Sequence, residues 1–143
     1  MSIYTVWVIN KAGGLVYFKE YQPYHAKISS NDALVIASTL QSVHAISTRI
    51  HPNHPSGFKR ITLKPKHGAG YSVHIFQTPT GLKFMATSAP NEQVEPFLKR
   101  VYELYADYTL KNYFHTPEMP IRCDQYEHHL AKLVGTTNNN NKK

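Results

Sequence analysis

Residues 3–9 read I-Y-T-V-W-V-I, and this run limits the possible folds more than any other part of the sequence. β-Branched and aromatic side chains fill both alternating faces of the run, a composition typical of a strand covered on both sides. We therefore predict a central strand here, rather than a strand at the edge of a sheet.

The remaining pattern predicts a second strand, a helix, three more strands and two further helices. Two glycines in Asn10–Gly14 favour a tight turn between the first two strands. The expected elements are a strand at 15–21, a helix at 33–50, strands at 58–63, 71–77 and 82–87, a helix opening at 89–92, and a helix at 123–134. Helical spacing of apolar residues in the first helix predicts a core-facing stripe of Ala33, Ile36, Ala37, Leu40, Val43, Ile46 and Ile50.

The order ββ-α-βββ-αα predicts an α+β fold, with helices packed against one antiparallel sheet. A length of 143 residues suits one domain. We assign residues 1–135 to that domain, with Gly135 as the helix C-cap. The polar run at 136–143 is expected to be a disordered tail.

Composition narrows the functional classes. Sixteen Lys and Arg against nine Asp and Glu give a net charge of +7, which permits a nucleic acid, an anionic membrane or an acidic protein as partner. The single cysteine, Cys123, excludes an intramolecular disulfide. No apolar run approaches the roughly 20 residues that span a bilayer, and the start of the chain has no basic signal region. These features favour a soluble, cytosolic protein.

No catalytic motif is present, and the nine histidines lack the spacing of a metal site, so we expect neither an enzyme nor a cofactor. The densest basic stretch lies at 58–67. It lacks the interleaved aromatic residues of a nucleic-acid surface and suits a charged edge strand. A membrane-facing basic surface is the functional alternative, and it would consist of Lys59, Arg60, Lys64 and Lys66.

Three motifs, in order along the chain, resemble the sybindin group of longin-like proteins. They are N-K-A-G-G-L-V-Y at 10–17, F-Q-T-P-T-G-L-K-F at 76–84, and Y-A-D-Y-T-L-K-N at 105–112 followed by E-M-P-I-R-C at 118–123. The resemblance covers residue 3 to about residue 134. It implies a longin-like fold with a five-stranded antiparallel sheet and helices on both faces.

The resemblance also implies a function. The chain would be a core subunit of the TRAPP (trafficking protein particle) tethering complex, at endoplasmic-reticulum and cis-Golgi membranes. Its partners would be the other TRAPP subunits and a Rab-type GTPase, whose nucleotide exchange the assembled complex promotes without covalent chemistry by this chain. The alternative is another longin-like scaffold or adaptor of membrane traffic without exchange activity.

Two surfaces are the candidates for these contacts. The loop at 112–124 carries two prolines, apolar anchors and a planar cation. From it we select Phe114, Met119, Pro120, Ile121, Arg122 and Asp124 as GTPase or partner contacts, although Met119 and Ile121 equally suit packing onto the sheet. Beside the stripe of the first helix, we select Leu34, Val35 and His44 as a subunit interface.

Two departures from the family pattern limit the comparison. Many relatives carry a PDZ-like insertion between the second strand and the first helix, where this chain has only the short link 22–28. Activities tied to that insertion are therefore not expected here. Tyr113 stands where the late family motif has a proline.

Overall fold

The computed structural model describes residues 3–21, 29–50, 60–63, 70–90, 93–112 and 119–140. Its elements follow the predicted order. They are β1 (Ile3–Ile9), β2 (Leu15–Glu20), α1 (Ser30–Ile50), β3 (Arg60–Leu63), β4 (Tyr71–Gln77), β5 (Lys83–Ser88), α2 (Glu95–Leu104), the π-helix η1 (Tyr105–Thr109) and α3 (Asp124–Asn139).

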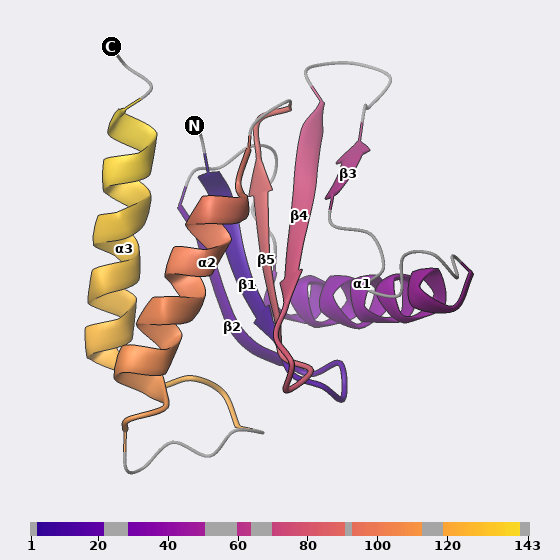
Figure 1. Ribbon diagram of the computed structural model, residues 1–143, viewed down its shortest axis with the longest axis horizontal. Helices are drawn as coiled ribbons and strands as arrows, with labels where there is room; N and C mark the ends of the chain where they lie inside the picture. The colour runs from indigo at the N-terminus through magenta and orange to yellow at the C-terminus, as the bar shows by residue number, and fades with distance from the viewer. Residues whose placement is uncertain are drawn as a thin grey trace.

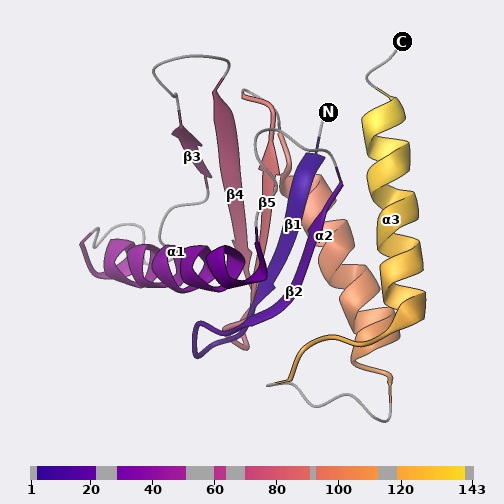
Figure 2. The same ribbon diagram turned by 180° about the vertical axis from the view of Figure 1, so that it is seen from behind.

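The sheet has the strand order β2-β1-β5-β4-β3, and all neighbouring strands are antiparallel. α1 lies across one face of this sheet, and α2 and α3 cover the other (Figures 1 and 2). The predicted α+β class, an antiparallel sheet between helices, is confirmed. None of the described helices is long and apolar enough to cross a membrane.

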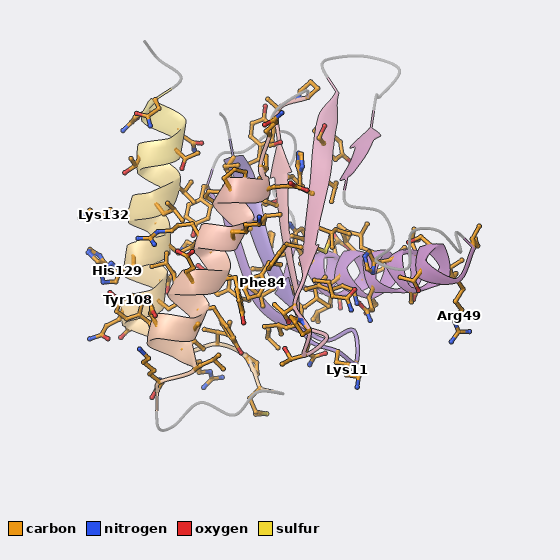
Figure 3. All side chains as sticks on the ribbon, viewed as in Figure 1. Lys11, Arg49, Phe84, Tyr108, His129 and Lys132 are labelled. Atoms are coloured by element: carbon orange, nitrogen blue, oxygen red, sulfur yellow. The ribbon has the colours of Figure 1, made fainter. Side chains whose placement is uncertain are left out.

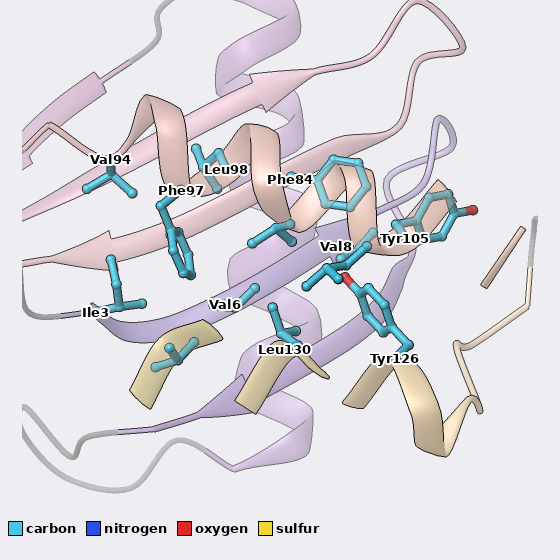
Figure 4. Packing of buried hydrophobic residues seen from close by; sticks show 14 of the residues in the cluster. Ile3, Val6, Val8, Phe84, Val94, Phe97, Leu98, Tyr105, Tyr126 and Leu130 are labelled. Atoms are coloured by element: carbon cyan, nitrogen blue, oxygen red, sulfur yellow. The ribbon is translucent and has the colours of Figure 1, made fainter. Parts of the chain in front are cut away.

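β1 lies inside the sheet, between β2 and β5, and is buried on both faces. Val6 and Val8 point into the larger core, beneath α2 and α3 (Figure 4). Trp7 and Ile9 point into the second core, beneath α1. The prediction of a central strand is confirmed, and its two apolar faces explain why helices occupy both sides.

α1 begins at a serine cap, because the backbone N–H of Asp32 donates to Ser29 Oγ at 3.2 Å. Its sheet-facing side is built from small residues: Ala33 and Ala37 are completely buried. The predicted stripe is confirmed at Leu40, which is half-buried against the second core, but it is wrong at four other members, which the fold leaves exposed. Their exposed fractions are 36% for Ile36, 42% for Val43, 56% for Ile46 and 73% for Ile50.

α2 continues directly into η1, in which the N–H of Leu110 bonds to the carbonyl of Tyr105 at 3.0 Å. The π turn keeps Tyr105 and Thr109 buried and leaves Leu110 at 51% exposure. Single π turns are frequent at functional sites. Sequence periodicity does not predict them, and here the regular α-helix, which begins at Glu95, ends at Leu104.

α3 is longer than expected. It passes through Gly135 without ending there and reaches Asn139, so the prediction of a disordered tail from residue 136 is wrong for residues 136–140. Asn138 holds the last turn by bonding twice to the backbone of Ile3. The Ile3 N–H donates to Asn138 Oδ1 at 2.8 Å, and Asn138 Nδ2 donates to the Ile3 carbonyl at 3.3 Å.

These two hydrogen bonds predict how much Asn138 contributes to stability. Replacing Asn138 with alanine removes both bonds and leaves the Ile3 backbone to water, which should lower the free energy of unfolding by about 1–2 kcal/mol. Urea unfolding followed by circular dichroism measures the change. The exposed neighbour gives a matched control, since Asn139→Ala should stay within about 0.5 kcal/mol of wild type. Equal effects of the two substitutions would contradict the assignment.

Candidate functional site

The segment Met119–Asp124 runs beside β2 before it enters α3. The N–H of Ile121 donates to the carbonyl of Val16 in β2 at 2.7 Å, which fixes the segment to the edge of the sheet. Ile121 itself is half-buried and packs against the larger core. Its predicted packing role is therefore the observed one, and it positions the segment.

The neighbours of Ile121 lie at the surface. Met119 is 58% exposed, and Pro120, Arg122 and Asp124 are also exposed. An apolar side chain, a rigid proline and a guanidinium thus stand together on a backbone that the sheet holds in place. Phe114, the other residue selected here, lies outside the described residues.

A tyrosine cluster occupies the core that Ile121 joins. The hydroxyls of Tyr17 and Tyr21 lie 3.4 Å apart, and the ring of Tyr126 packs edge-on against Tyr17. Burial is the main cause that raises the pKa of each of these three phenols above its usual value, and in Tyr21 the hydrogen bond to Tyr17 adds to the effect. The core that Ile121 joins therefore contains three phenols that keep their protons at neutral pH.

These raised pKa values predict how stability depends on pH. In the unfolded chain a tyrosine ionises near pH 10, whereas in the folded chain the three phenols keep their protons to higher pH. The folded state thus binds more protons above pH 10, and the free energy of unfolding should fall as pH rises. Each phenol contributes about 1.4 kcal/mol per pH unit. Urea titrations from about pH 9 to 11 should show a shallower fall for Tyr21→Phe, and an unchanged slope would contradict this origin.

The surface where η1 meets α3 was not selected from the sequence. Tyr108 stacks on His129, with ring centroids 4.4 Å apart and planes at 14°, and Lys132 lies one turn further along α3 (Figure 3). Cys123 is half-buried, and its thiol points at the Tyr108 carbonyl, 3.9 Å from Sγ to O. The sequence does not predict this contact, because Tyr108 and His129 meet only when η1 and α3 pack with these two residues facing each other.

The outer surface of α1 is the second candidate. Leu34 and Val35, predicted as interface residues, are 49% and 62% exposed. The fold therefore leaves both side chains free for a partner.

His44, the third residue of that predicted interface, does not lie on this surface. It is only 2% exposed, on the sheet-facing side of α1 in line with Ala33 and Ala37. His44 follows Ala37 by seven residues, about two helical turns, and a helix returns to nearly the same face at that spacing. The prediction that it contacts a partner is wrong, because its side chain is buried against the sheet.

The predicted basic surface is only partly within the described residues. Arg60 opens β3, which is the last strand in the order, so the edge position expected for this basic strand is confirmed. Lys59, Lys64 and Lys66 lie outside the described residues, and the structure describes Arg60 only through its backbone. Within the described part of the chain, no three His, Cys, Asp or Glu side chains are placed to hold a metal ion.

The arrangement of sheet and helices is that of a known fold class. The structure superposes on a Roadblock/LC7 domain from Streptomyces avermitilis with a TM-score of 0.51, over 75% of this chain and 88% of that chain. Sequence identity is 5%, so this likeness concerns the fold alone.

The family follows from the sequence comparison. The model of the Sybindin-like family matches residues 3–137, and the chain belongs to this family. The resemblance carried by the three motifs is thereby confirmed.

Two relatives show how far the similarity extends. Trafficking protein particle complex subunit 4 of Dictyostelium discoideum is 38% identical over 138 residues, which are 94% of this chain and 98% of that protein. The protein of the same name from Bos taurus is 34% identical over 106 residues, 73% of this chain but 46% of the bovine protein. The chain thus spans nearly all of the first relative and about half of the second.

Proposed function

We propose that this chain is a non-catalytic subunit of a TRAPP tethering complex and contributes to nucleotide exchange on a Rab-type GTPase in transport between endoplasmic reticulum and Golgi. The observation that carries the proposal is the family match over residues 3–137, together with relatives that bear the name of a TRAPP subunit. The assembled complex would bind the nucleotide-free GTPase more tightly than the loaded one and so expel the nucleotide.

The surface of α1 supports the role in assembly. Between Asp32 and Arg49 the helix has no Asp, Glu, Lys or Arg, although Leu34, Val35 and several larger apolar side chains are exposed. An apolar surface with few charges that is exposed in the free chain is typical of the region that a partner buries at the centre of an interface. Leu34 and Val35 are accordingly the subunit contacts of this proposal.

The Met119–Asp124 segment supports the role in exchange. A docking segment that is already held in place loses little conformational entropy when a partner binds. The hydrogen bond from Ile121 to Val16 supplies that order, while Met119 and Arg122 stay exposed. An exposed methionine beside an arginine offers an apolar anchor and a cation that pairs with a carboxylate. Phe114, Pro120 and Asp124 complete the proposed contact, and the basic strand with Arg60 is proposed to face the anionic membrane.

The experiment uses the complex purified through a tag on this chain. Release of a fluorescent guanine nucleotide from the Rab-type GTPase is compared for wild type, Arg122→Glu and the control Lys132→Glu. Both substitutions reverse one exposed charge, but Lys132 lies on the outer side of α3, away from the segment (Figure 3). We expect Arg122→Glu to slow release by about tenfold or more with the subunits still co-eluting, and Lys132→Glu to leave it unchanged.

Each other outcome contradicts a specific part of the proposal. If Arg122→Glu leaves the rate of nucleotide release unchanged, the segment is not part of the exchange surface. Loss of co-elution in Arg122→Glu assigns the segment to assembly instead. If the wild-type complex contains its subunits but does not promote nucleotide exchange, the alternative holds, and the chain is a scaffold of membrane traffic without exchange activity.

A further inference from the structure

Lys83 is a charged residue within an apolar layer of the molecule. It opens β5 and pairs across the sheet with Ile9 of β1, so its side chain lies on the same face as Ile9 and Met85, the face that α1 covers. Only 4% of the residue is exposed. The buried part is the aliphatic stem, because the ammonium nitrogen at its end keeps contact with solvent.

No group within the described residues compensates this charge. The ion pairs in that part of the chain use Lys19, Arg100 and Lys111. The Lys83 ammonium takes part in none of them and donates no hydrogen bond there. Burial lowers the pKa of Lys83 below its usual value. A partly dehydrated cation without a counter-charge costs stability, and groups in such an environment are concentrated at functional sites.

A second lysine lies at the same end of the sheet. Beyond the pair of Ile9 with Lys83, the strand register continues to Lys11 opposite Gly81. The structure contains this contact, because a Cβ added to Gly81 would meet the Lys11 side chain at 3.0–3.3 Å. Diagonal neighbours across an antiparallel pair have Cα atoms about 7–8 Å apart, so the two lysine side chains are able to reach one ligand. Lys11 is exposed, and none of the ion pairs between described residues includes it.

Two turns hold Lys11 in this position. Gly13 and Gly81 have φ values of 92° and 90°, a conformation that a side chain would strain. Gln41 of α1 packs on Gly13, and its Nε2 donates to the Lys11 carbonyl at 3.3 Å. The tips of the β1–β2 and β4–β5 hairpins therefore lie side by side at one end of the sheet (Figures 1 and 2), and Lys11 extends from the first of them (Figure 3).

We propose that Lys11 and Lys83 together bind a phosphate group at the surface between these two hairpin turns. Two ammonium groups match the two negative charges of a phosphate monoester, whereas a single carboxylate would neutralise only one of them. The lysines belong to the motifs at 10–17 and 76–84, which the proposed roles in assembly and exchange do not use. A soluble sugar or inositol phosphate and a phosphorylated lipid headgroup present the same chemistry here, and the experiment distinguishes these sources.

Nuclear magnetic resonance of the purified full chain, titrated with inositol monophosphate at constant ionic strength, tests the site. Amide signals of the two turns should shift, and Lys83→Met should weaken binding by about tenfold or more, because it removes one charge-assisted contact. Lys11→Met should weaken it similarly. Lys99→Met is the matched control, since it removes the charge of an exposed lysine on α2, on the other face of the sheet, and should leave binding unchanged.

Thermal unfolding separates a binding role of Lys83 from a structural one. Methionine keeps an apolar stem and removes the dehydrated charge, so Lys83→Met should raise the unfolding midpoint by about 2–4 °C. Inositol monophosphate should raise the midpoint of the wild type, but not that of Lys83→Met. A lysine that only supports the fold gives the opposite result, because its replacement lowers the midpoint.

The source of the phosphate follows from flotation with phosphatidylcholine vesicles that contain a phosphatidylinositol monophosphate. Flotation that requires this lipid and Lys83 assigns the site to a headgroup, whereas binding of the soluble phosphate without flotation assigns it to a soluble ligand. The proposal is overturned if neither probe binds, or if Lys99→Met weakens binding as much as Lys83→Met. A glutamate-rich peptide that binds through Lys83 when inositol monophosphate does not also overturns it. No other subunit is present, so these failures are distinct from failure of the exchange assay.

Discussion

The burial of β1 on both faces is the constraint on which the rest of the structure depends. A strand with mainly apolar side chains on both of its faces is stable only when each face is covered and each edge is paired. Val6 and Val8 require α2 and α3 on one side, while Trp7 and Ile9 require α1 on the other. β2 and β5 pair with its two edges, and Asn138 forms hydrogen bonds to the backbone of Ile3 at its first residue.

Covering the second face has a consequence for α1. The side of α1 toward the sheet presents Ala33 and Ala37, whose small side chains let the helix lie close over Trp7 and Ile9. Leu40 packs partly against this core, whereas Ile36, Val43, Ile46 and Ile50 lie outside it. The surface that we assign to assembly is thus a product of how the sheet is covered, and α1 contributes both to the stability of the chain and to its partner surface.

The order of the elements and the central place of β1 were predictable, because alternation and turn residues are local signals. The side of α1 that faces the sheet was not, since a helix with apolar residues on two sides fits two orientations. Counting apolar residues favoured Ile36, Val43 and Ile46, whereas packing selected the smaller alanines and His44. The end of α3 was missed for another reason: the polar run at 136–139 suits disorder by composition, and only the fold reveals that Asn138 meets the backbone of Ile3.

The two-sided character of α1 is the central claim, and thermal unfolding of two lysine variants tests it most directly. Ala37→Lys puts a charge into the contact with the sheet and should destabilise the isolated chain by about 3 kcal/mol or more. Val43→Lys puts the same charge on the outer side, 42% exposed, and should change the free energy of unfolding of the monomer by less than about 0.5 kcal/mol. Equal destabilisation by the two variants would show that Val43 belongs to the core and would contradict the account.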